Sequence, residues 1–325
     1  MRLKLVPDET SIDFLGLRRW TVGASALAAA LSLVFLLVFG LNFGIDFRGG
    51  SMIMAETDAP ADIAAYRAAL SPLNLGEVTV TGISDPAAEL TGTPRNAVMI
   101  RIVAQGDEAL EADAVNLATA ALQSEIDGVR ILSTDSVGAK VSGELVWAGA
   151  LALALAVAAV LFYIWIRFEW QFALGAVAAL VHDVVLTLGL FALIQLEFNL
   201  SIIAALLTII GYSLNDTVVV FDRVREDLRR YKTRPLVEVL NLSVNQTLSR
   251  TLMTSATTLI ALIALYVLGG EVIRGFTFAM IWGIVVGTYS SIFVAAVVLL
   301  RLGVARDTGE AAPSGGVRFG APDAP

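Results

Sequence analysis

The sequence of 325 residues contains no cysteine and a single histidine. Without cysteine it can form neither a disulfide framework nor a thiolate metal site, and one histidine argues against a histidine-based metal cluster. It also lacks a Gly-Lys-Ser/Thr phosphate-binding loop, so ATP is not a direct energy source for this chain. We therefore predict that the protein is not an enzyme and carries no cofactor.

Charge is also scarce, because only 16% of the residues are Asp, Glu, Lys or Arg, whereas 57% are hydrophobic. The net charge of −8 and the isoelectric point near 4.8 exclude a generally basic nucleic-acid binder. The mean hydropathy of +0.76 is typical of a membrane protein. Runs long enough to cross about 30 Å of hydrocarbon predict six spans. These lie at residues 21–41, 145–166, 171–194, 200–222, 251–269 and 275–300.

The distribution of Lys and Arg predicts an orientation, because cationic segments stay on the cytoplasmic side. Arg18 and Arg19 precede the first span, and the connection at 223–250 contains six cations before Pro235. We expect residues 1–20, 223–250 and 301–325 to be cytoplasmic, in a protein that crosses the membrane several times and contacts lipid. The tail is rich in Gly, Pro and Ala and is predicted to be disordered.

Residues 42–144 form the only segment long enough to fold outside the membrane. Alternating apolar residues predict strands near 51–56, 77–83, 97–104 and 129–134. Helical spacing predicts one helix with Ile63, Tyr66 and Leu70 on its inner face and another with Leu117 and Ala121. The order β-α-β-β-α-β predicts a ferredoxin-like extracytoplasmic α+β domain between the first two spans. Its surface is acidic, and no pair of acids has a spacing that indicates catalysis.

Ionisable residues are few within and next to the predicted spans, and four of them are of interest. A charge in mid-membrane costs roughly 2.5 to 3.5 kcal/mol on insertion, so such groups are candidates for function. His182 and Asp183 lie midway along the third span, Asp216 lies in the fourth, and Arg250 opens the fifth. We predict that Asp216 and Arg250 form a pair and that these four residues relay protons. The alternative is that they are static polar contacts between helices.

Polar and small residues near these groups recur at helical spacing. Arg250, Thr254 and Thr257 share one helix face, as do Ser213 and Asp216. These faces are predicted to turn toward one another. Small residues that permit close helix approach lie at Gly283, Gly287 and Ser291, and at Gly175, Ala179 and Asp183.

Two strings resemble a known family. Phe43-Gly-Ile-Asp-Phe-Arg-Gly-Gly50 follows the first span, and Gly211-Tyr-Ser-Leu-Asn-Asp-Thr-Val-Val-Val-Phe-Asp-Arg-Val-Arg-Glu226 lies in the fourth. Both are similar to signatures of the SecD/SecF family, within the resistance-nodulation-division superfamily. The signature residues are Gly44, Asp46, Arg48, Gly49, Gly50, Gly211, Asn215, Asp222 and Arg223. The two glycines after Arg48 also permit a tight bend from span to strand.

The resemblance implies a subunit of the Sec protein-export machinery that pairs with SecD and uses the proton-motive force to assist translocation. It further implies contact with the SecYEG translocon, SecA-engaged preproteins and other Sec accessory subunits. In this family the proton-relay acid corresponds to Asp216 and its arginine to Arg250.

Two other functions fit the membrane pattern. One is half of a proton-coupled small-molecule efflux pump, and the other is an assembly factor whose buried polar groups only fix helix packing. Neutral substitutions at Asp216 and Arg250 distinguish an assembly factor from a transporter, because an assembly factor should tolerate them.

Overall fold

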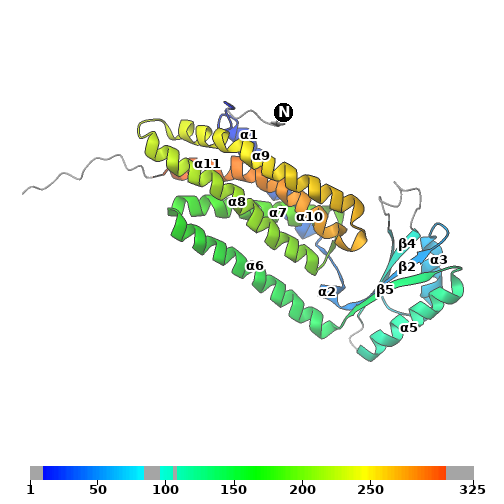
Figure 1. The fold of residues 1–325 in the computed structure, drawn as a ribbon. Helices are drawn as coiled ribbons and strands as arrows, with labels where there is room; N and C mark the ends of the chain where they lie inside the picture. Colours follow the sequence, from blue (N-terminus) through cyan, green and yellow to red (C-terminus); the bar gives the residue numbers. More distant parts are fainter. Residues whose placement is uncertain (1–9, 84–95, 105–107, 305–325) are drawn as a thin grey trace, which may run out of the picture.

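Six helices of the computed structural model are long and apolar enough to cross a membrane (Figure 1). The structure describes residues 10–83, 96–104 and 108–304. The spans are α1 (Arg18–Val38), α6 (Ala139–Arg167), α7 (Trp170–Ile194), α8 (Leu200–Arg230), α9 (Leu236–Leu268) and a last continuous helix. That helix consists of α10 (Glu271–Ser290), a π-helix (Ser291–Ala295) and α11 (Ala296–Leu302). The chain is therefore a multi-pass membrane protein.

Helices α8 and α9 extend beyond the predicted spans. Only residues 231–235 connect them, so most of the segment 223–250 is helical. Tyr231 ends α8, and Arg234 stacks on its ring at 4.5 Å before Pro235 caps α9. The predicted disordered tail and the first nine residues lie outside the described ranges, apart from residues 301–304.

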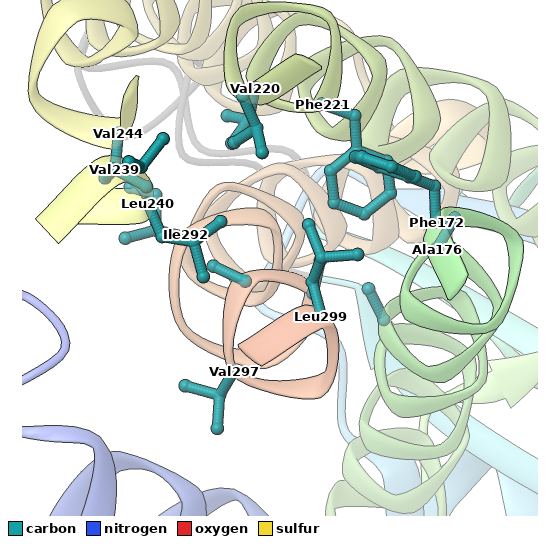
Figure 2. Packing of buried hydrophobic residues seen from close by; sticks show 14 of the residues in the cluster. Phe172, Ala176, Val220, Phe221, Val239, Leu240, Val244, Ile292, Val297 and Leu299 are labelled. Carbon is teal, nitrogen blue, oxygen red and sulfur yellow. The ribbon is translucent and has the colours of Figure 1, made fainter. Parts of the chain in front are cut away.

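The centre of the bundle consists of α7, α8 and the last helix. Figure 2 shows Phe172 of α7 and Phe221 of α8 meeting Leu299 of α11, with Leu240 of α9 beside Ile292. By contrast, only 6% of the most apolar stretch of α6 is buried, compared with 61% for the last helix. Most of the surface of α6 is therefore available to lipid or to other protein helices.

Small residues bring the central helices together. A Cβ atom at Gly283 of α10 would collide with the side chain of Ile209 on α8, and one at Gly287 would lie 3.1 Å from Ser213. A Cβ atom at Gly175 of α7 would lie 3.2 Å from the carbonyl oxygen of Ala295. These glycines allow the close contacts that small residues provide in membranes, as the sequence predicted.

A four-stranded sheet with two helices lies between α1 and α6, at one end of the bundle (Figure 1). Its strands β2 (Gly50–Thr57), β3 (Val78–Ile83), β4 (Asn96–Val103) and β5 (Arg130–Val137) are antiparallel in the order β3-β4-β2-β5. Ile53 pairs with Ile100 at the centre of this sheet, where both side chains are fully buried. The two helices are α3 (Ile63–Leu70) and α5 (Glu108–Glu125).

The inner face of α5 differs from the predicted one. Ala118 and Leu122 are fully buried, whereas Leu117 is 52% exposed. On α3, Tyr66 and Leu70 are buried as predicted. Apolar residues occupy more than one face of the alanine-rich α5, so their spacing alone did not determine which face meets the sheet.

Candidate functional site

Asp183 lies at the centre of a polar network inside the bundle. Its side chain is 1% exposed. Oδ2 accepts hydrogen bonds from the hydroxyls of Ser213 on α8, at 2.6 Å, and Ser290 on α10, at 2.8 Å. Oδ1 lies 3.1 Å from Nδ1 of His182. Three helices thus supply polar groups to one buried carboxylate, which offsets the cost of its removal from water.

His182 connects this network to α1. Its ring stacks with that of Tyr289 at a centroid distance of 6.1 Å. The hydroxyl of Tyr289 donates to the carbonyl oxygen of Thr21 and lies 2.9 Å from that of Ser25. Among the described residues, the buried Nε2 of His182 has no hydrogen-bond partner.

Asp216 lies on α8, three residues after Ser213, and its side chain is 3% exposed. Its Oδ2 atom is buried and accepts no hydrogen bond from the part of the chain that the structure describes. The next residue, Thr217, contacts Ser291 through their hydroxyls at 2.8 Å, and Ser291 also reaches the backbone carbonyl of Ser213. Ser291 begins the π-helix, a local widening that often marks functional sites.

Arg250 does not pair with Asp216 as predicted. Within the described part of the chain, the two side chains form no ion pair at 4 Å or less, and Arg250 is exposed. Its charge acts on Asp216 only through space. Helical spacing correctly placed the residues along the chain, but it could not determine the rotation of α9.

The face of α9 that meets the bundle is offset from the predicted stripe. Thr254 and Thr257 are exposed, whereas Thr251 and Ser255 are buried. The hydroxyl of Ser255 lies 2.8 Å from that of Thr288 on α10. The buried stripe continues from apolar residues earlier in α9, because Leu240, Val244 and Leu248 face the core.

The first family string forms a junction between the sheet and the bundle. Strand β1 (Asn42–Phe43) pairs in parallel with β6 (Glu197–Phe198), which connects α7 to α8. Asp46, in the short helix α2 (Ile45–Arg48), accepts a 2.8 Å hydrogen bond from the backbone N–H of Leu200 at the start of α8. A carboxylate at a helix N-terminus satisfies a free N–H group and complements the helix dipole.

The glycines of this string are required by the backbone and by close contacts. Gly49 has φ +73° and Gly50 has φ +122°, a region that L-residues rarely adopt. A Cβ atom at Gly50 would collide with the carbonyl oxygen of Ile102, and one at Gly44 would collide with the carboxylate of Glu197. Arg48 is exposed.

Glu197 is an ionisable residue at this junction that sequence reasoning did not identify. The pKa of its carboxyl is raised, because burial and the nearby charge of Asp46 outweigh the opposing effect of Arg101. Arg101 of β4 donates a 3.0 Å hydrogen bond to the carbonyl oxygen of Phe43. The junction therefore brings together Arg101 from the sheet, Asp46 from α2 and Glu197 from β6.

The signature residues of α8 have separate surroundings. Asp222 pairs with Arg167 at 2.8 Å, and Arg223 pairs with Glu226 at 2.7 Å. Gly211 and Asn215 are exposed, and a Cβ atom at Gly211 would meet nothing within 4 Å. The structure therefore brings His182, Asp183 and Asp216 into the centre of the bundle. The four signature residues of α8 described above lie outside it.

Sequence reasoning also missed Ser290 and the hydroxyl of Tyr289 as members of the buried network. Ser290 lies beside Ser291, which the small-residue pattern had identified. Serine and threonine in a span were the available signal, but their acceptors depend on how the helices are rotated.

Two family models match the sequence. One, described as protein export membrane protein SecD/SecF, C-terminal, matches residues 118–305, and the SecD/SecF GG motif matches residues 34–61. Among relatives, protein translocase subunit SecF of Rhodobacter capsulatus is 51% identical over 333 residues, which cover 99% of both chains. Protein translocase subunit SecDF of Brucella abortus is 44% identical over 93% of this chain and 39% of its own length.

The fold also matches a solved structure. The crystal structure of SecDF from Thermus thermophilus superposes with a TM-score of 0.80 at 32% identity. The match covers 93% of this chain but only 40% of the SecDF chain, so that protein is more than twice as long as the part that is similar.

Proposed function

Because this chain belongs to the SecD/SecF family of protein-export membrane proteins, we propose that it is the SecF subunit of a bacterial protein translocase that uses the proton-motive force. The identity of 51% to a SecF over nearly the whole of both chains supports this role. The work of such a subunit is transport, and no catalytic residue is proposed.

The proposed proton carrier is Asp216. The observation that supports it is a buried Oδ2 atom with no hydrogen-bond partner, one helical turn from the Ser213 hydroxyl that bonds Asp183. An unsatisfied carboxylate oxygen in a low-dielectric site favours the neutral, protonated form. His182, Asp183 and the serine hydroxyls provide further groups along which a proton could pass.

Arg250 completes the proposed cycle by moving. An arginine beside Asp216 would stabilise the ionised carboxylate and release its proton. The open arrangement described above corresponds to the protonated state, and a rotation of α9 that brings Arg250 inward would give the deprotonated state. One charge crossing 100 mV supplies about 2.3 kcal/mol, which shifts a two-state equilibrium about fiftyfold.

The sheet domain is the proposed moving part. We propose that it is a ferredoxin-like unit, which its element order and strand order support. We assign it to the extracytoplasmic side, with both termini in the cytoplasm. Asp46 and β1 join this domain to the start of α8, the helix that carries Asp216. A shift of α8 would therefore reach the domain directly.

SecD is the proposed partner. The match covers only 40% of the solved SecDF chain, so the rest of that chain is long enough to form a second unit. Helices α1 and α6 have large uncovered apolar faces, which include Leu37, Leu155 and Ile166. These faces would meet SecD helices or lipid, and the SecYEG translocon and its preproteins would be contacted by the assembled complex.

The test uses the chain co-reconstituted with SecD and SecYEG in vesicles, with export measured with and without an imposed proton gradient. Asp216→Asn should remove the gradient-dependent increase and leave the export that occurs without a gradient. Glu238→Gln is the matched control, because Glu238 is an exposed carboxylate in the first turn of α9. If Asp216→Asn retained the full increase, Asp216 would not be the carrier.

A further inference from the structure

A charged hollow of about 540 Å³ lies between the end of α6 and the last turns of α8. Figure 1 shows these two helix ends at the end of the bundle far from the sheet. The hollow is outside the buried network described above. It is lined by Arg167, Asp222, Arg225, Glu226, Arg229 and Arg230.

The charges in this hollow follow from helical spacing. Asp222, Arg225, Glu226 and Arg229 recur at intervals of three and four residues, so they share one face of α8, opposite Arg167. Both acids are neutralised by ion pairs, because Asp222 pairs with Arg167 and Glu226 pairs with Arg223. The hollow as a whole is therefore positive.

Arg225, Arg229 and Arg230 supply the charge that remains, and Arg230 lies over the ring of Tyr231. In the described ranges Arg225 and Arg229 form no ion pair within 4 Å, although one N–H of Arg225 donates to the carbonyl oxygen of Arg167 at 3.3 Å. They are four residues apart, so their side chains emerge about 6 Å from each other. Two guanidinium groups at that separation can bind the oxygens of one phosphate from two sides.

Exposed apolar side chains lie next to Arg167 in the chain. Trp165 is 64% exposed and Ile166 is 68% exposed, on α6 immediately before Arg167, and Trp170 begins α7 after it. Tryptophan at the end of a span marks the level of the lipid headgroups. A free phosphate ion would make no contact with this apolar surface, whereas the acyl chains of a lipid would pack against it.

We propose that the hollow binds the phosphate headgroup of an anionic phospholipid. Arg225 and Arg229 contact the phosphate, and the acyl chains run along the uncovered face of α6. Basic pockets between membrane helices at this level bind such headgroups. The bound lipid fills the gap between α6 and α8, and this proposal does not depend on proton transfer through Asp216.

The experiment is native mass spectrometry of the full chain in mild detergent, with phosphatidylglycerol and phosphatidylcholine of identical acyl chains. The wild-type chain should bind the anionic lipid several times more tightly. Arg225→Gln/Arg229→Gln should weaken phosphatidylglycerol binding about fivefold for each arginine. Phosphatidylcholine binding should fall less, because its choline ammonium offsets the charge of its phosphate. Arg225→Lys/Arg229→Lys keeps the charge and should retain most of the preference.

The matched control is Arg234→Gln/Arg301→Gln, which removes two exposed arginines that do not line the hollow. It should keep the lipid preference. An equal loss in both double variants would show general charge attraction and would overturn the site. So would displacement of the lipid by millimolar inorganic phosphate, which would indicate an ion site. A double variant that kept its lipid preference but lost SecD during purification would identify a protein interface instead.

Discussion

The carboxylate of Asp183 on α7 accepts a 2.6 Å hydrogen bond from the hydroxyl of Ser213 on α8, and both side chains are 1% exposed. Ser213 lies one helical turn before Asp216, whose Oδ2 atom has no hydrogen-bond partner in the described ranges. One acid is thus held by hydroxyls, while no such contact holds Oδ2 of the other. This difference supports our proposal that Asp183 is fixed and that Asp216 exchanges a proton.

Loss of the Ser213 hydroxyl should destabilise the bundle. Ser213→Ala leaves Asp183 with one fewer donor in a buried site, and this should cost roughly 1 to 3 kcal/mol. Thermal unfolding in detergent measures the effect. Thr208→Ala is the control, because Thr208 is exposed on the same helix and bonds only its own backbone. Equal effects of the two substitutions would contradict the hydrogen-bond assignment.

The close approach of α8 and α10 should depend on Gly283. Gly283→Ala places a methyl group against Ile209 and should cost about 1 to 3 kcal/mol through overpacking. At Gly211 the added methyl meets open space, so Gly211→Ala should be neutral or stabilising. Unfolding of both variants tests the packing. A stable Gly283→Ala chain would show that the helices lie further apart.

Asp46 should stabilise the start of α8 from the neighbouring domain. Asp46→Ala removes the acceptor for the N–H of Leu200 and should cost roughly 0.5 to 2 kcal/mol. Asp46→Asn keeps an acceptor oxygen and should recover most of this. Hydrogen exchange at the first turn of α8 reports the change directly. Arg48→Ala is the control, because Arg48 lies two residues away and its side chain is exposed. It should leave that exchange rate unaltered.

Stability should fall as Glu197 ionises. Its pKa is raised in the folded chain, so the protonated form is the one that folding favours. The contribution is complete below the unfolded value of about 4.3 and is lost as the pH rises through the higher folded pKa. Glu197→Gln should therefore unfold at a higher temperature than the wild type near pH 8, with the difference shrinking toward pH 4.

The control for this pH dependence is Glu77→Gln, which alters an exposed carboxyl of the sheet domain. The unfolding temperature of Glu77→Gln should stay close to that of the wild type from pH 4 to pH 8. If the unfolding temperatures of Glu197→Gln and the wild type changed in parallel with pH, burial of the Glu197 carboxyl would not couple to folding.

The six apolar helices and the order of strands and helices in the domain were predictable from periodicity. The period of two in residues such as Ile53 and Ala55, and the length of the apolar runs, depend only on local sequence. The glycine pair at Gly49 and Gly50 likewise indicated a bend, and both have positive φ.

The relations between helices were not predictable in the same way. Spacing placed Arg250 and Asp216 on neighbouring spans, but the rotation of α9 is set by Leu240, Val244 and Leu248, which continue the core. The hydroxyl donors of Asp183 come from helices far apart in sequence, so a single chain pattern could not pair them. The acids themselves were found because ionisable groups in spans are rare.

The most direct test of the account is infrared detection of the Asp216 carboxyl in the reconstituted complex with SecD. We predict a protonated-carboxyl band that disappears when the outside pH is raised and returns when it is lowered, and that is absent from Asp216→Asn but present in Glu238→Gln. A band that persists unchanged at every pH in the wild type, or that remains in Asp216→Asn, would contradict proton exchange at this residue.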